Sequence, residues 1–119
     1  VSDPKYKVDM FLGIGGGPEG VLAASALDTY KCHFQGRFIF DNEKDIREAK
    51  AMGITDLDKK YDLSEIVKGD SLFCATGITN SEILKGITVD NQKCTSETLV
   101  THKDSNFKKV VKNVFLLNE

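Results

Sequence analysis

The feature that most constrains the fold of this chain is a glycine-rich turn at residues 13–20, with the sequence GIGGGPEG. Residues 5–14 first alternate between polar and apolar types and then become continuously apolar, which predicts a strand entering a covered sheet. Pro18 has a fixed φ that suits the first position of a helix, and Glu19 follows it. The stretch therefore predicts a strand, a tight turn and a helix in immediate succession.

The helix after the turn is expected to lie close against a sheet, because it is rich in small residues. Four of its residues recur at the spacing of one buried helical stripe: Ala23, Ala26, Leu27 and Tyr30. A second strand is predicted at residues 34–40. A second helix is then predicted to start near Asp41 or Asn42 and to stop at Gly53.

The remainder of the chain predicts a short helix and then several strands. Asp62 and Glu65 have the spacing of a capping box, for a helix that ends at Gly69. Residues 71–78 are expected to form a buried strand. Turn-like residues then separate β-branched runs, which predicts that the last strands are joined by hairpins.

This order of elements predicts an α/β fold, a layered sandwich in which helices flank a mixed β-sheet. The chain of 119 residues is long enough for one hydrophobic core, so residues 1–119 are expected to form a single domain. The net charge of -2 and the scattered basic residues give no footprint for nucleic acid or an anionic membrane. No stretch approaches the roughly 20 apolar residues that span a bilayer. We therefore expect a small-molecule or protein partner.

The cysteines of the chain are Cys32, Cys74 and Cys94, which are widely spaced and odd in number. They contain no Cys-x-x-Cys pair, so the sequence indicates neither a zinc site nor a disulfide framework. Each is expected to be a small buried or half-buried thiol. A reducing cytoplasm is the compartment that fits this pattern best.

Two nucleotide-binding interpretations of the glycine turn fail at specific residues. A dinucleotide fingerprint needs a third glycine at the position of Pro18, and a phosphate loop of the Walker type needs a Gly-Lys-Ser/Thr ending that is missing. A third interpretation starts from Glu19. Its carboxylate would suit a divalent cation that also coordinates a phosphate, while glycine N–H groups bind the remaining oxygens.

The spacing alone leaves a simpler explanation of the turn open. A helix N-terminus favours a negative charge by roughly 0.3–1 kcal/mol, which is sufficient reason for an acidic Glu19. The glycines at positions 15–17 would permit positive φ values and a close approach of the backbone to a ligand. Both a metal-assisted phosphoryl site and a plain helix start on a tight turn agree with the residues.

Other candidate residues have simpler interpretations. Asp56, Asp58 and Asp62 lack the glycine and the glutamate of a calcium loop, so they are expected to be a solvated charged face. His33 and His102 have no carboxylate or cysteine at a suggestive spacing and are expected to be ordinary surface or half-buried residues.

The CATGIT sequence at residues 74–79 joins the expected buried strand to a turn. Such a position could face a ligand at the carboxyl end of a strand. The alternative is a tight turn before a helix, with Thr76 and Thr79 satisfying backbone groups.

Four motifs occur in order along the chain: GIGGGPEGVLAASAL, QGRF, AMGITDLDKKYDLSEIVKGDSLFCATGIT and LKGI. Together they resemble the C-terminal part of the class II (GlpX-type) fructose-1,6-bisphosphatases, from about Val8 to the end of the chain. Many relatives have alanine where this chain has Gly17, a change that is expected to relax the loop without abolishing its role.

The resemblance implies a phosphatase that removes the 1-phosphate of fructose 1,6-bisphosphate in gluconeogenesis, with Mn²⁺ or Mg²⁺ as cofactor. Some members of the family also accept sedoheptulose bisphosphate. The implied fold is related to the inositol monophosphatase group. Carried over to this chain, the family's motif makes Glu19 a metal ligand and places Gly16, with Gly17 beside it, against the sugar bisphosphate.

The family's other metal carboxylates and its catalytic threonine belong to an N-terminal lobe, which this chain does not contain. Because the chain begins with Val1, and because two-metal hydrolysis needs several carboxylates, we expect a C-terminal lobe that is inactive alone. The resemblance implies a cytoplasmic homo-oligomer whose N-terminal lobe completes the site. The alternative, from a different class of protein, is a non-catalytic binding or oligomerisation module.

Overall fold

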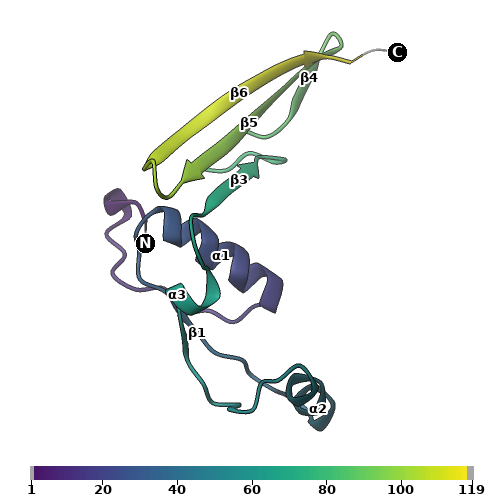
Figure 1. The fold of residues 1–119 in the computed structure, drawn as a ribbon. Coiled ribbons are helices and arrows are strands. Elements are labelled where there is room, and N and C mark those ends of the chain that lie inside the picture. The colour runs from purple at the N-terminus through teal and green to yellow at the C-terminus, as the bar shows by residue number, and fades with distance from the viewer. Residues whose placement is uncertain (1, 118–119) are drawn as a thin grey trace.

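The computed structural model describes residues 2–117, in which helices alternate with strands as far as residue 76 and strands alone follow (Figure 1). The α/β class predicted from the sequence is confirmed. The elements in chain order are a 3-10 helix η1 (Pro4–Tyr6), α1 (Gly17–Thr29), β1 (Gln35–Gly36), α2 (Glu43–Ala51), β2 (Tyr61–Asp62), α3 (Leu63–Ile66), β3 (Leu72–Thr76), β4 (Thr88–Asp90), β5 (Lys93–His102) and β6 (Phe107–Leu116).

The strands form two sheets, and every pairing between the described strands is antiparallel. β1 and β2 make a two-stranded ribbon, whereas the other four strands form one sheet around β5. β3 and β4 pair along one edge of β5, and β6 pairs along the other edge. The parallel pairings of a mixed sheet, which the sequence led us to expect, do not occur within residues 2–117.

The hairpins predicted for the end of the chain are confirmed. Asn91 and Gln92 join β4 to β5 with φ values of 45° and 65°, and Asn106 ends the turn into β6 with a φ of 52°. Two consecutive residues with positive φ are typical of a type I′ turn, whose twist matches the twist of the flanking strands.

Residues 7–16 do not form the predicted strand. The segment carries no helix or strand, and no strand of the described chain pairs with it (Figure 1). Its apolar side chains point into solvent, because Met10, Phe11, Leu12 and Ile14 are between 71% and 88% exposed. A strand needs a neighbour to take up its N–H and C=O groups. The apolar pattern fits a strand, but residues 2–117 provide no partner for it.

The second predicted strand, at residues 34–40, is reduced to the two residues of β1. The aromatic residues after β1 pack among themselves, since the Phe38 ring lies 5.9 Å from the ring of Phe40 and 5.9 Å from that of Tyr61. The prediction was wrong in length because β1 has a partner of only two residues, β2.

The local signals for the next two helices are confirmed. Asn42 caps α2 by accepting a hydrogen bond from the Asp45 N–H at 3.0 Å, and Gly53 follows the helix with a φ of 88°. The capping box of Asp62 and Glu65 begins α3. That helix ends at Ile66, earlier than predicted.

α1 lies beneath the large sheet, where its last turn contacts β3 and β5 (Figure 1). The predicted stripe is displaced by about one residue. Ala24, Asp28 and Thr29 are the buried positions, whereas Ala23 is exposed. The reason is that hydrogen bonds to the sheet fix the rotation of α1 about its axis. In one of them, Thr29 Oγ1 donates to Thr101 Oγ1 at 2.8 Å. The spacing of apolar residues in the sequence cannot predict such a hydrogen bond.

β3 is paired as predicted but is not a buried strand. Its residues alternate between exposed and half-buried, and Leu72 is 63% exposed. No helix follows it, since residues 77–87 form an irregular loop. In this loop the backbone approaches itself closely, because a Cβ on Gly77 would lie 2.5 Å from Lys85 O and one on Gly86 would lie 2.7 Å from Ile78 O.

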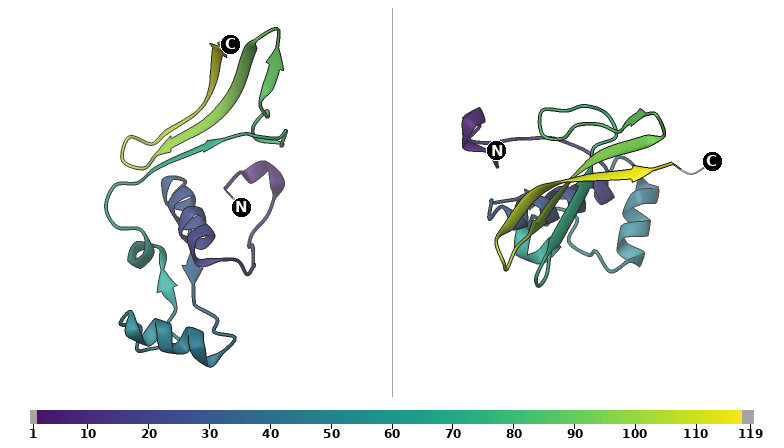
Figure 2. Two further views of the ribbon diagram at one scale, coloured as in Figure 1. Left: turned by 90° about the vertical axis from the view of Figure 1, so that its right-hand side faces the viewer. Right: turned by 90° about the horizontal axis from the view of Figure 1, so that it is seen from above.

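The structure is elongated and its core is small (Figure 2). Its radius of gyration is 18.2 Å, compared with about 13.5 Å for a compact chain of this length. Its accessible surface of 9296 Å² exceeds the roughly 6,400 Å² expected for a folded monomer of this mass. Among the residues that the structure describes, the buried apolar ones are Ala24, Ala49, Leu84 and Cys94. None of the helices described within residues 2–117 is long and apolar enough to cross a membrane.

Candidate functional site: the glycine loop at the start of α1

The glycine loop ends at the N-terminus of α1. Gly16 is the N-cap residue, with φ -66° and ψ 154°, and Glu19 lies in the first turn of the helix. Because the helix begins at Gly17, Pro18 occupies its second position, one residue later than predicted. The first turn of a helix leaves N–H groups without intrahelical partners, so this end of α1 presents donors and a partial positive charge.

The structure brings the two principal predicted site residues together. The carboxylate of Glu19 folds back over Gly16, so that a Cβ added to Gly16 would collide with Oε2 of Glu19. Any side chain at position 16 would therefore displace that carboxylate. Gly17 is different, since a Cβ there would meet nothing within 4 Å. Glycine at position 16 leaves room for the carboxylate in this position, whereas a methyl side chain at position 17 would meet nothing.

The loop glycines do not use the positive φ values that glycine would permit there. Within residues 2–117 the glycines with positive φ are Gly53 and Gly69. The backbone reaches α1 through an extended N-cap, which any residue can adopt. What glycine at position 16 provides in this structure is space for the end of the Glu19 side chain.

The described residues do not form a complete metal site. No group of three or more histidine, cysteine, aspartate or glutamate side chains within residues 2–117 is arranged to hold an ion. Glu19 can act as one carboxylate ligand, and the open backbone at Gly16 leaves space beside it. The loop therefore offers a single carboxylate, and the described residues place no second or third ligand beside it.

The aspartates that resemble a calcium loop are exposed, as predicted, and two of them accept hydrogen bonds from other residues. Asp56 Oδ1 accepts the N–H of Asp58 at 3.1 Å, and Asp62 Oδ1 accepts a bond from Gln35 Nε2 at 2.7 Å. Thr76, a candidate ligand contact, instead shares a hydrogen bond of 2.9 Å with the hydroxyl of Thr98 on β5.

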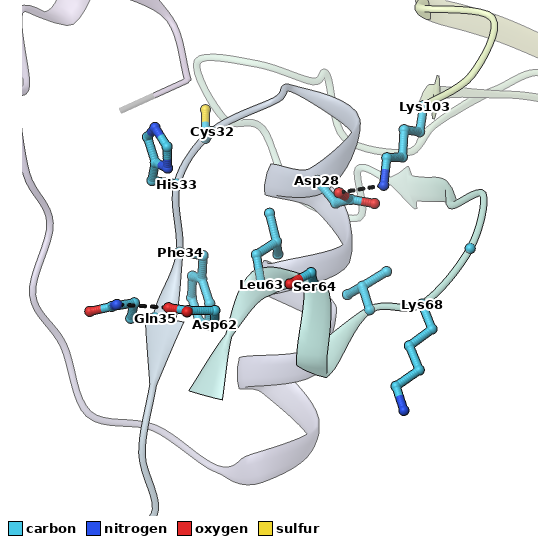
Figure 3. A pocket seen from close by; sticks show the side chains of 12 residues that line it. Asp28, Cys32, His33, Phe34, Gln35, Asp62, Leu63, Ser64, Lys68 and Lys103 are labelled. Carbon is cyan, nitrogen blue, oxygen red and sulfur yellow. Dashed lines mark hydrogen bonds and ion pairs between the residues drawn. The ribbon is translucent and has the colours of Figure 1, made fainter. Parts of the chain in front are cut away.

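An open cleft of about 780 Å³ lies beside α1 and α3, and the sequence did not predict it (Figure 3). Its charged groups are largely compensated within the cleft. Lys103 Nζ pairs with Asp28 Oδ1 at 3.0 Å, and Ser71 Oγ donates to Asp28 Oδ2 at 2.6 Å. The side chain of Lys68 points away from the ion pair (Figure 3). The cleft contains neither Glu19 nor the glycine loop, so it is separate from the candidate site.

His102 has a carboxylate partner that sequence spacing missed. Its Nε2 lies 2.5 Å from Oδ2 of Asp70, and its Nδ1 lies 2.7 Å from Oγ of Ser105. Pairing of β3 with β5 brings the two together, since Leu72 is the register partner of His102. The three groups are hydrogen-bonded in a row at the turn between β5 and β6, and Ser105 does not line the cleft.

Two carboxyl groups near the strands have lowered pKa values. Desolvation acts to raise the pKa of Asp70, but hydrogen bonds from His102 and the Asp104 N–H outweigh it, and the net shift is downward. A hydrogen bond from Lys59, 2.8 Å away, and another from the Asp62 N–H lower the pKa of Glu65. Both groups stabilise local turns and lie outside the glycine loop.

The cysteines match the prediction in part. All three are free thiols, with Cys94 buried and Cys32 half-buried, as expected. Cys74 is exposed because it lies on the face of β3 that no helix covers.

Comparison with known proteins places the chain in a class of sugar phosphatases. Residues 1–115 match the family described as bacterial fructose-1,6-bisphosphatase, glpX-encoded. The chain belongs to this family.

Individual relatives carry the name D-fructose 1,6-bisphosphatase class 2/sedoheptulose 1,7-bisphosphatase. One from Synechococcus sp. (strain JA-2-3B'a(2-13)) is 37% identical over 111 residues, covering 82% of this chain and 32% of the relative. One from Gloeobacter violaceus is 34% identical over 124 residues, covering 93% of this chain and 36% of the relative. The chain thus spans about a third of the length of the curated relatives that it matches.

Proposed function

We propose that this chain supplies the glycine loop and one metal ligand to the active site of a class 2 fructose-1,6-bisphosphatase. The observation that carries the proposal is the family match over residues 1–115, which includes the entire loop. The reaction is hydrolysis of the 1-phosphate of fructose 1,6-bisphosphate to fructose 6-phosphate and phosphate. Sedoheptulose 1,7-bisphosphate, named for the relatives, is a second candidate substrate.

Two residues of the loop have distinct roles in this proposal. Glu19 holds a divalent ion, Mn²⁺ or Mg²⁺, by its carboxylate. When bound, such an ion polarises a phosphoryl oxygen and makes a bound water more acidic. Gly16 keeps the approach to Glu19 free of a side chain, and Gly17 borders the substrate beside it. The free N–H groups at the start of α1 are suited to the remaining phosphate oxygens.

The other walls of the site are proposed to belong to an N-terminal lobe of the same cytoplasmic protein. Glu19 is one carboxylate, whereas two-metal hydrolysis uses several from different elements. The extended shape and the exposed apolar segment at residues 7–16 support contact with such a lobe. The isolated chain is therefore expected to release no phosphate from fructose 1,6-bisphosphate, with Mn²⁺ or Mg²⁺ present.

The experiment compares Glu19→Gln with the unchanged sequence in the longest natural polypeptide that contains this chain. Glutamine keeps the size of the side chain but loses its charge. We expect kcat/KM for fructose 1,6-bisphosphate to fall by about a hundredfold or more, with weaker Mn²⁺ binding in calorimetry.

Glu43→Gln is the matched control, because Glu43 lies in the first turn of α2 as Glu19 lies in the first turn of α1. Its partner Arg47 is 3.7 Å away and exposed, so the change should leave activity and Mn²⁺ affinity unaltered. Full activity and full Mn²⁺ affinity of the Glu19→Gln protein would contradict the proposal. They would favour the second candidate, a binding or oligomerisation module, which the large exposed apolar surface also suits.

A further inference from the structure

Three side chains at the turn between β5 and β6 form a continuous row of hydrogen bonds. His102 Nε2 lies 2.5 Å from Oδ2 of Asp70, and His102 Nδ1 lies 2.7 Å from Oγ of Ser105. The row joins a carboxylate, an imidazole and a hydroxyl, which are the groups that together activate a serine as a nucleophile. Ser105 is exposed, so its hydroxyl is open to a reactant from solvent.

The charge of Asp70 decides which nitrogen of His102 carries a proton. The lowered pKa of Asp70 keeps its carboxyl group ionised at neutral pH, and an ionised carboxylate only accepts hydrogen bonds. The proton of the neutral imidazole therefore lies on Nε2, which donates to Asp70. This leaves the lone pair of Nδ1 to accept the Ser105 hydroxyl proton, as a general base must.

Backbone hydrogen bonds hold the turn in place around these side chains. Asp104 N–H donates to Oδ1 of Asp70 at 3.2 Å, and Lys103 N–H donates to Ser71 O at 2.9 Å. Ser105 N–H has no acceptor in the part of the chain that the structure describes, so it is a free backbone donor beside the hydroxyl. Such a donor can stabilise the oxyanion that forms when a nucleophile attacks a carbonyl group.

Apolar side chains flank His102 on the face of the sheet opposite α1. Thr101 bonds to α1, so its neighbour His102 projects to the other face. Leu72 on β3 and Phe107 on β6 are both register partners of His102, and directly opposed residues share a face. Leu72 is 63% exposed and Phe107 is 43% exposed. They offer an open apolar surface to the acyl group of a small ester.

We propose that Ser105, His102 and Asp70 form a reactive site, separate from the glycine loop, at which Ser105 accepts the acyl group of small carboxylic esters. Ser105 Oγ attacks the carbonyl carbon, and its proton passes to Nδ1 of His102. The bond between the carbonyl carbon and the ester oxygen then breaks, and the leaving alcohol takes the proton from Nδ1. Water hydrolyses the acyl-serine by the same route, which releases the carboxylic acid and restores the Ser105 hydroxyl. This inference does not depend on the phosphatase proposal.

The first test measures hydrolysis of 4-nitrophenyl acetate by the longest natural polypeptide that contains this chain. Ser105→Ala removes the attacking oxygen and should lower kcat/KM at least about tenfold. Ser81→Ala is the matched control, because Ser81 is also exposed in a loop but its hydroxyl donates to Leu84 O at 3.1 Å instead of to a histidine. Equal rates in the unmodified and Ser105→Ala proteins, or equal losses with both alanines, would overturn the proposal.

The second test identifies the reacting residue with a fluorophosphonate, a reagent for activated serine hydroxyls. Ser105 Oγ forms a bond to phosphorus and passes its proton to His102, while the bond between phosphorus and fluorine breaks and fluoride leaves. Mass spectrometry of the peptides should find the adduct on Ser105 and none on Ser81. A folded protein without an adduct on Ser105, or with equal labelling of Ser81, would contradict the proposed site.

His102→Gln removes the base but keeps polar groups that can bond to Asp70 and Ser105, so the turn should stay folded. The rate of fluorophosphonate labelling at Ser105 should fall at least about a hundredfold, as expected for the loss of a general base. His33→Gln is the control, because His33 is exposed and lies on the segment after α1. An unchanged rate in the His102→Gln protein would overturn the proposal.

Asp70 is a positioning residue, because it acts through His102. The amide of Asp70→Asn can donate to Nε2, which moves the imidazole proton to Nδ1 and removes the acceptor for the Ser105 hydroxyl. Nitrogen-15 NMR should show a protonated Nε2 in the unmodified protein and a protonated Nδ1 in the Asp70→Asn protein, where labelling should be at least about tenfold slower. The same tautomer and the same labelling rate in both proteins would refute this arrangement.

Discussion

The two ends of α1 differ in what surrounds them. At the C-terminal end, Asp28 and Thr29 are buried and bonded to Ser71, Lys103 and Thr101 of the large sheet and its flanking turns. At the N-terminal end, the segment before the helix exposes the apolar side chains of Met10, Phe11, Leu12 and Ile14 to solvent. The C-terminal end of α1 is therefore buried among polar contacts, whereas the apolar side chains before its N-terminal end are exposed. Buried hydrogen bonds fix the orientation of the groups that they join. An exposed apolar surface instead indicates a contact with something other than residues 2–117.

The largest expected effect is the difference in unfolding free energy between truncating a buried leucine and truncating an exposed one. Leu84 is 8% exposed and Leu12 is 84% exposed. Leu84→Ala should lower the free energy of unfolding by about 2–3 kcal/mol, because it leaves a cavity. Leu12→Ala should change it by less than about 0.5 kcal/mol. Urea denaturation measures both, and equal losses would show that residues 7–16 belong to the core.

The polar junction is tested next by Asp28→Ala. The substitution leaves Lys103 and the Ser71 hydroxyl without their buried acceptor, so we expect a loss of about 2 kcal/mol in unfolding free energy. Glu43→Ala, which removes an exposed pair with Arg47, should cost less than about 0.5 kcal/mol. Similar small losses for both would mean that α1 is held by apolar contacts after all.

A smaller effect is expected in the loop between β3 and β4. Gly86→Ala places a Cβ 2.7 Å from Ile78 O, so the backbone must shift, at a cost of about 1–2 kcal/mol in unfolding free energy. Gly20→Ala is the control, since nothing lies within 4 Å of its added Cβ and α1 should gain stability. Thermal unfolding of the two variants should therefore shift in opposite directions.

The smallest effect is the pH dependence of the turn held by Asp70. Its pKa is lowered in the folded chain, so its contribution is present above its ordinary value of 3.8 and is lost as the pH falls through the lowered pKa. Asp70→Asn should therefore show a weaker loss of stability on acidification below about pH 4 than the unmodified chain. Asp58→Asn, at an exposed position, should keep the original profile.

Local features of the fold were predictable from the sequence. The cap of α2 at Asn42, the capping box of α3 and the hairpin turns depend on residues only a few positions apart. The proximity of the two principal residues of the candidate site was predictable for the same reason. Gly16 and Glu19 are three residues apart on the first turn of a helix, so local geometry brings them together.

Features that depend on distant partners were not predictable. The apolar pattern of residues 5–14 indicates a strand but cannot state whether a neighbouring strand exists. The Asp70 and His102 side chains meet only because β3 and β5 pair, and their spacing in the sequence gives no sign of it.

The sequence by itself determined the family, the α/β class and the glycine loop with its carboxylate, because these depend on residue identity and short spacing. Only the tertiary structure decided the antiparallel sheet around β5, the rotation of α1 and the contact between Asp70 and His102. Each of these is set by hydrogen bonds between segments far apart in the chain, and such bonds leave no periodic signal in the sequence.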